Sequence, residues 1–150
     1  MSASRRAFVM RQAWLLALGG SGLMAGREAQ ASSDELAFDA VSMRDALAAL
    51  GGIPATGAEI MLSAPELVEN GAVVPVTVDC RLAAAREVYI VVEANPNPLV
   101  VRFDIPEGTD AWVSTRIKMA ASGSVYAVVR AEGKLYAASR EVQVMVGGCG

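Results

Sequence analysis

Residues 125–146, VYAVVRAEGKLYAASREVQVMV, decide the fold. Two apolar runs, 125–131 and 134–146, flank the dipeptide Glu132–Gly133. Two such runs joined by a two-residue connection that contains glycine predict a β-hairpin, because glycine readily adopts the positive φ of a tight turn. The second strand is long, and pairing with a partner chain is one way in which its edge would be protected.

Further strands are predicted upstream, at spacings of about 8–15 residues. In 72–80, Val74, Val76 and Val78 alternate with more polar positions, and Pro75 favours an edge strand or a bulge. No β-α-β alternation is visible. About seven short strands therefore predict an all-β protein, an antiparallel β-sandwich of ordinary size. The other predicted strands cover 59–63, 87–93, 99–105 and 111–119.

One short helix is predicted near residues 40–50, after a loose polar start at 32–38. Asp39 is placed to cap its first turn, and Gly51–Gly52 ends it. Residues spaced at i, i+4 and i+7 give it one apolar stripe, which would face the sandwich. That stripe consists of Met43, Leu47 and Leu50.

Residues 1–31 have the pattern of a signal peptide: a basic start, a short apolar run and the small-x-small site Ala29–Gln30–Ala31. Arg5 and Arg6, followed by Phe8, resemble a twin-arginine export signal. Two other interpretations are an ordinary basic leader and a membrane anchor. The anchor is disfavoured because the apolar run is short and interrupted by glycines. We expect a periplasmic protein with no membrane attachment after processing.

Charge and composition exclude several functions. The chain has 13 basic residues, 16 acidic residues and no histidine. Residues 1–31 hold four of the basic and one of the acidic residues, which leaves a net charge of −6 on the remainder. Such a chain is not expected to bind nucleic acid. It also lacks Ser–His and Cys–His nucleophile pairs, a zinc ligand set and a cofactor loop, so neither a metal nor a cofactor is expected and an independent enzyme is disfavoured.

The C-terminal sequence carries the most informative chemistry. Gly147 and Gly148 precede Cys149, and Gly150 follows it. Because glycine restricts the backbone little, residues 147–150 are predicted to form a flexible arm with a reach of about 13 Å. No neighbouring cation or helix start is evident to lower the pKa of the thiol. We therefore expect Cys149 to be a handle that becomes reactive inside another protein's site.

Other roles for Cys149 remain open. It could be a stray thiol on a frayed tail, or it could form an intermolecular disulfide. It could also pair with Cys80, which would make the protein a structural or interaction module. Cys80 ends the predicted strand 72–80 in register with its buried valines, so we expect it to be a small core residue.

Several segments together resemble the SoxY family, the carrier subunit of the periplasmic Sox sulfur-oxidation system. The resemblance covers nearly all of the chain after the leader, and the segments together are far more specific than the tail alone. They are APELVENGAVVPVTV (64–78), NPNP (95–98), STRIKM (114–119), VYAVV (125–129), GKLY (133–136) and the terminal GGCG.

The resemblance implies an immunoglobulin-like sandwich over residues 32–146 that forms a heterodimer with a SoxZ-like subunit. It implies that thiosulfate-derived sulfur is attached to Cys149. A haem cytochrome would load this thiol, a hydrolase would release sulfate, and a sulfane dehydrogenase would act where one is present. The family pattern has two glycines after the cysteine, whereas only Gly150 follows here. The shorter tip is expected to preserve function but can alter docking or loading.

Overall fold

The computed structural model describes residues 33–145, and those from Asp34 onward belong to one compact unit. The predicted leader (1–31) and arm (147–150) lie outside this range, so those boundaries stay predictions. Within the described range, residues 33–39 are helical and are followed by one further helix and by nine strands. These are α3 (Met43–Leu50), β1 (Ala55–Thr56), β2 (Ile60–Ser63), β3 (Leu67–Val68), β4 (Val74–Cys80), β5 (Ala85–Val92), β6 (Leu99–Asp104), β7 (Ala111–Ile117), β8 (Gly123–Ala131) and β9 (Lys134–Val144).

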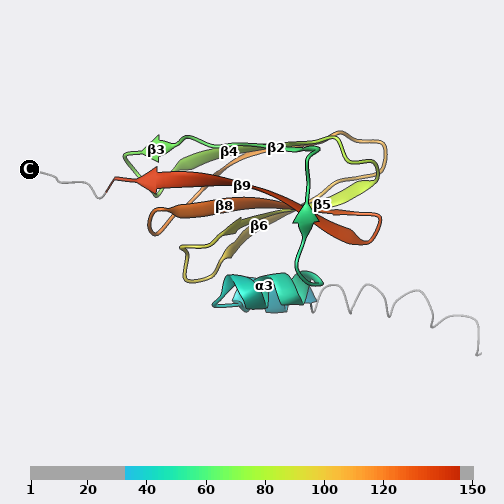
Figure 1. The fold of residues 1–150 in the computed structure, drawn as a ribbon, viewed down its shortest axis with the longest axis horizontal. Helices are drawn as coiled ribbons and strands as arrows, with labels where there is room; N and C mark the ends of the chain where they lie inside the picture. The colour runs from blue at the N-terminus through green and yellow to red at the C-terminus, as the bar shows by residue number, and fades with distance from the viewer. Residues whose placement is uncertain (1–32, 146–150) are drawn as a thin grey trace, which may run out of the picture. The chain divides into compact units, whose positions relative to one another are not determined.

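The strands form two sheets packed face to face (Figure 1). The larger has the order β1-β9-β8-β5-β6, with β3 also paired to β9, and the smaller has the order β2-β4-β7. All pairings are antiparallel except those of β1 and β3 with β9. The predicted immunoglobulin-like sandwich is confirmed, and its seven predicted strands correspond to β2 and to β4 through β9.

The hairpin that decides the fold forms as predicted. Ala131 lies opposite Lys134, and the two residues between them have positive φ, 51° at Glu132 and 73° at Gly133. Two consecutive positive φ values define a type I′ turn, whose twist matches that of the flanking strands. The turn therefore fixes the register of β8 and β9 from Ala131 back to Gly123, which lies opposite Val142.

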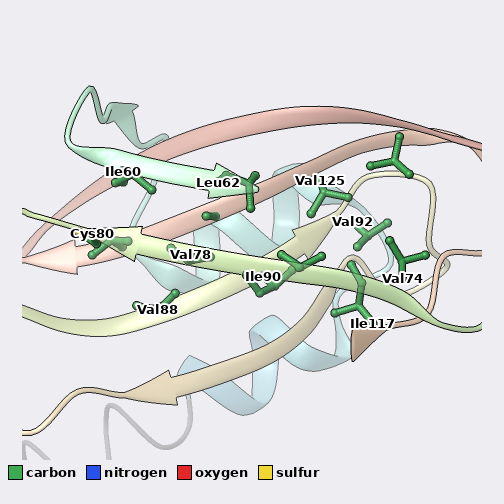
Figure 2. Packing of buried hydrophobic residues seen from close by; sticks show 14 of the residues in the cluster. Ile60, Leu62, Val74, Val78, Cys80, Val88, Ile90, Val92, Ile117 and Val125 are labelled. Atoms are coloured by element: carbon green, nitrogen blue, oxygen red, sulfur yellow. The ribbon is translucent and has the colours of Figure 1, made fainter. Parts of the chain in front are cut away.

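The core lies between the two sheets (Figure 2). In β4, Val74, Val76 and Val78 are almost fully buried, as their alternation predicts. They face β5, whose continuous apolar run is buried on both sides because the larger sheet is covered on both faces. The β5 residues on the inner face are Val88, Ile90 and Val92.

Of two predictions about sheet edges, one is wrong and one stays a prediction. Pro75 does not lie in an edge strand, because β4 is the middle strand of the smaller sheet. Its missing N–H is tolerated because the β2 pairing ends at Thr77, so no β2 residue lies opposite Pro75. β1 and β3 pair with the outer edge of β9 near its two ends, and pairing of this edge with a partner chain stays a prediction.

A helical layer covers the other face of the larger sheet, below β8 and β6 in Figure 1. Leu47 and Leu50 are buried against it, which confirms the predicted stripe. Two details of the prediction are wrong. Residues 33–39 are helical rather than a loose start. The cap of α3 is Ser42 rather than Asp39, since the Ser42 hydroxyl accepts a hydrogen bond from the Asp45 amide at 3.1 Å.

Glu87 on β5 is the centre of a part-buried polar cluster on the helix-covered face. Its Oε2 accepts hydrogen bonds from the Tyr89 hydroxyl and from Arg130 Nε, both at 2.6 Å. Its Oε1 accepts from Arg102 Nη2 at 3.1 Å. Burial, followed by the hydrogen bond to Glu87, raises the pKa of Tyr89 to about 12.

The two arginines of this cluster hold the helical layer on the sheet. Arg130 Nη2 donates to the carbonyl of Leu50 at the end of α3, at 2.6 Å. Arg102 forms an ion pair with Asp34, a buried residue of the helical segment 33–39. The cluster thus links both helical segments to neighbouring strands of the larger sheet.

Candidate functional site

The residues expected to carry the chemistry lie beyond the part of the chain that the structure describes. Met145, directly after β9, is the last described residue. The geometry that can be examined is therefore that of Gln143, Val144 and Met145, which we call the arm base. The predictions that fall outside the described range concern Cys149 with Gly147, Gly148 and Gly150, and the export motif of Arg5, Arg6 and Phe8.

On one side, the arm base is held by β3. Gln143 N donates to the carbonyl of Glu66 at 2.8 Å, and Met145 N donates to the carbonyl of Val68 at 2.9 Å. Val68 and Val144 lie opposite each other in this short parallel pairing. Two of the three arm-base amides are therefore satisfied by the segment APELVENG, which the sequence singled out without a role.

On the other side, the arm base is held by Ser122. Strand β8 begins at Gly123, opposite Val142, so β8 has no residue opposite Val144. The Ser122 hydroxyl fills this position. It accepts a hydrogen bond from Val144 N at 2.8 Å and lies 3.3 Å from the Val144 carbonyl, to which it donates. The Ser122 side chain thus takes the place of a backbone hydrogen-bond partner for Val144 beyond the start of β8.

The predicted turn at Asn70–Gly71 is confirmed, and it packs directly against the arm base. The Asn70 side chain accepts a hydrogen bond from Ala72 N at 2.9 Å. The Gly71 carbonyl accepts from Met119 N at 2.7 Å. A Cβ on Gly71 would lie 2.5 Å from the Met119 carbonyl oxygen and 3.1 Å from a Val144 methyl group, so glycine is required here by space.

Asn95, from the NPNP motif, braces the segment that leads to Ser122. Its Nδ2 donates to the carbonyl of Lys118 at 2.7 Å, and its Oδ1 accepts from Ala120 N at 2.8 Å. Asn97 of the same motif donates to the carbonyl of Ala40 at 3.2 Å. The motif therefore connects the loop before β8 with the link between the two helical segments.

Two large apolar side chains are exposed here, one on β3 and one at the end of the arm base. Leu67 is 59% exposed and Met145 is 51% exposed. Within residues 33–145, no group of histidine, cysteine, aspartate or glutamate side chains could hold a metal ion. The hydrogen bonds at the arm base can hold the end of β9 in place up to Met145.

Cys80 is a core residue, as predicted. Its thiol is free and the residue is 7% exposed, opposite Ile60 and Ala111 in the smaller sheet. Burial is the main cause that raises its thiol pKa above the ordinary value. It lies at the far end of β4 from Val74 and the Asn70–Gly71 turn, about 20 Å along the strand. This position separates it from the arm base.

A hollow of about 830 Å³ lies beside Cys80, between residues 81–86 before and at the start of β5 and residues 106–112 before and at the start of β7. Arg86 and Glu107 face each other across it at 3.6 Å, and both are well exposed. The hollow is at the opposite end of β4 from the arm base and shares none of its residues.

None of the helices described within residues 33–145 has the length and apolar character of a membrane span.

Comparisons with known proteins match this architecture. The family model for "Sulfur oxidation protein SoxY" matches residues 46–149. Among solved structures, the sulfur carrier protein SoxY from Chlorobium limicola f thiosulfatophilum is similar, with a TM-score of 0.59 and 41% sequence identity. That match covers 66% of this chain and 91% of the other. No curated protein matches the sequence.

Proposed function

The chain belongs to the SoxY family of sulfur-oxidation proteins, and we propose that it is a carrier that holds thiosulfate-derived sulfur on the thiol of Cys149. The observation that carries this proposal is the match of the family model through residue 149, where the sequence is Gly-Gly-Cys-Gly. A related protein of known structure is itself a sulfur carrier.

The proposed chemistry places the reactive machinery in partner enzymes. Loading joins the Cys149 sulfur to the outer sulfur of thiosulfate, releases the thiol proton and passes two electrons to a haem cytochrome. A hydrolase then releases the sulfonate group as sulfate by addition of water, which leaves the outer sulfur on Cys149. A sulfane dehydrogenase, where present, oxidises that remaining sulfur. The carrier supplies the thiol and its delivery.

The geometry of the arm base supports a carrier that presents its thiol while partner enzymes perform the chemistry. β3 and Ser122 hold the chain up to Met145. Cys149 lies four positions after Met145, and a fully extended chain covers at most about 14 Å over that length. A partner enzyme must therefore approach the arm base closely, and its reactive centre must lie at the end of a channel no deeper than this reach.

Export and assembly form part of the same proposal. Arg5, Arg6 and Phe8 support twin-arginine export, and hence a periplasmic location. A SoxZ-like subunit is the proposed partner in a heterodimer. Size measurement on the two subunits after co-expression tests the pairing, and a monomer that ignores the second subunit would contradict it.

The test of the carrier role compares two cysteine variants in thiosulfate oxidation with purified partner enzymes. Cys149→Ser is expected to abolish thiosulfate oxidation and sulfur loading because it removes the attachment atom. The matched control is Cys80→Ser, in which the other cysteine is replaced and loading is expected to continue. Loading of the Cys149→Ser variant would refute the proposal. The free, buried thiol of Cys80 gives no support to a structural module built on a Cys80–Cys149 disulfide.

A further inference from the structure

The end of β9 is held in an unusual way. Beyond Val142, the larger sheet no longer supplies a backbone partner on the β8 side, because β8 begins at Gly123. An edge strand in this situation normally frays, since terminal amides exchange their partners for water. Here the Ser122 hydroxyl bonds both the amide and the carbonyl of Val144. We propose that Ser122 is a positioning residue of the carrier, which fixes the point from which the Cys149 arm starts.

The arm base is held from two sides, by β3 and by Ser122, and we call this arrangement the clamp. Gln143 and Met145 donate to β3, and Val144, between them, donates to Ser122. The three amides therefore alternate between the two sides, as in the interior of a sheet. β3 has only two residues, so its hold on the arm base is short. Of these three amides, that of Val144 is the one that donates to a side chain, the hydroxyl of Ser122.

Ser122 lies in a loop that is itself fixed. Met119 N donates to the Gly71 carbonyl, and Asn95 bonds Lys118 and Ala120 on the other side. After Ser122, Gly123 lies so close to Ala94 that an added Cβ would be 2.9 Å from the Ala94 Cβ. A hydroxyl on such a loop can hold a strand end in place, whereas one on a mobile loop would move with it.

The clamp has a consequence for the arm, provided that the proposed carrier function is correct. With the clamp closed, Cys149 lies four residues from the fixed point at Met145, a reach of about 14 Å. With the arm base released back to Val142, the separation is seven residues and the reach is about 25 Å. The effective concentration of an end group falls roughly as the −3/2 power of tether length, so release lowers it about twofold. Release also removes the direction in which the arm leaves the sandwich.

The experiment compares Ser122→Ala with Ser122→Thr, which keeps the hydroxyl. Ser114→Ala is the matched control because the Ser114 hydroxyl also forms a hydrogen bond, to Thr77 at 3.0 Å, but on the smaller sheet. Amide hydrogen exchange is measured at Val144 and, as a reference for global stability, at Val91. Ser122→Ala is expected to speed exchange at Val144 about tenfold, from the loss of two hydrogen bonds, and to speed exchange at Val91 by no more than that factor. The other two variants should match the unaltered protein.

The second readout is enzymatic loading of Cys149 with thiosulfate. Ser122→Ala is expected to raise the KM for the carrier two- to fivefold with kcat unchanged, because the thiol is the same once the arm is in the enzyme's channel. Ser122→Thr should restore the normal KM. The rate of Cys149 alkylation by iodoacetamide should not change in any variant, since a small reagent does not depend on the direction of the arm.

The outcomes separate the two proposals. Unchanged exchange at Val144 in Ser122→Ala would overturn the clamp. Faster exchange with an unchanged KM would overturn its positioning role. Loading of Cys149→Ser would instead overturn the carrier function, and exchange at Val144 would still decide whether the clamp exists.

Discussion

Replacement of Glu87 by glutamine tests how the helical layer is held on the sheet. The side chain of Glu87 is 12% exposed, and those of Arg130 and Arg102 are 19% and 24% exposed. The substitution keeps the size of the side chain but removes the charge that both arginines share. It also puts an amide donor near two guanidinium groups, which have no acceptor, so that among these neighbours only the Tyr89 hydroxyl can accept its hydrogen bond.

The expected cost follows from the partners that would remain. Removing one member of a buried ion pair typically costs about 3–5 kcal/mol, because the other charge stays buried. Here Arg130 keeps the Leu50 carbonyl and Arg102 keeps Asp34, so the lower end applies, about 3 kcal/mol. For a domain of roughly 100–120 residues this lowers Tm by about 12 °C.

The assay is thermal unfolding of the mature protein followed by circular dichroism, with urea unfolding as a second measure. The matched control is Glu107→Gln, because Glu107 is also paired with an arginine, Arg86, but is 88% exposed. An exposed pair contributes less than about 1 kcal/mol, so this variant should unfold within a few degrees of the unaltered protein. Equal shifts for the two variants would refute the assignment of Glu87 as the main anchor of the helical layer.

Three further predictions follow from the core and the arm base. Gly71→Ala should destabilise the protein by about 1–3 kcal/mol in urea unfolding, because the new methyl group meets the Met119 carbonyl; an unchanged midpoint would contradict this contact. The Tyr89 phenol should ionise near pH 12, in absorbance titration, against an ordinary value of 10. Because its folded pKa is raised, the contribution of Tyr89 to the free energy of unfolding is fully present below pH 10 and should be lost between pH 10 and 12, a decrease of order 2 kcal/mol. Tyr89→Phe should not show this decrease, and the same loss of stability at alkaline pH in that variant would contradict the prediction. Iodoacetamide should modify Cys149 alone in the folded mature protein and Cys80 as well in urea, since Cys80 is buried; two modified thiols without urea would contradict this burial.

Long or strongly alternating segments of the sandwich were predictable from the sequence. Val74, Val76 and Val78 repeat with the period of a strand, and Glu132–Gly133 fits one kind of turn. Strands β1 and β3 have two residues each, which is too short for any periodicity to be detected. They exist only because the outer edge of β9 offers them unpaired backbone groups.

The errors near the N-terminus arose from competition between equally suitable residues. Ser42 and Asp39 are both good helix caps, and only the packing of α3 on the sheet selects Ser42. Because residues 33–39 were interpreted as a polar start, the burial of Asp34 and Ala37 was not predicted. A carboxylate is buried only where a partner of opposite charge lies beside it. The partner of Asp34 is Arg102, which is distant from it in the sequence.

The candidate site was likewise only partly predictable from the sequence. Cys149 stands out in the sequence because glycines surround it. The residues that hold the arm base do not stand out, because Ser122 bonds Val144 across 22 positions and Val68 belongs to a two-residue strand. The segments 64–78 and 95–98 were singled out as motifs, but only the structure assigns them the task of fixing the end of β9.

The central claim is that Cys149 carries the sulfur. Its most direct test is intact-mass and tandem mass spectrometry of the protein isolated without reductant from cells that oxidise thiosulfate. The account predicts added sulfur or a thiosulfonate group on Cys149, removable by reductant, with Cys80 unmodified. An unmodified Cys149 in protein from actively oxidising cells, or the added sulfur on Cys80, would contradict it.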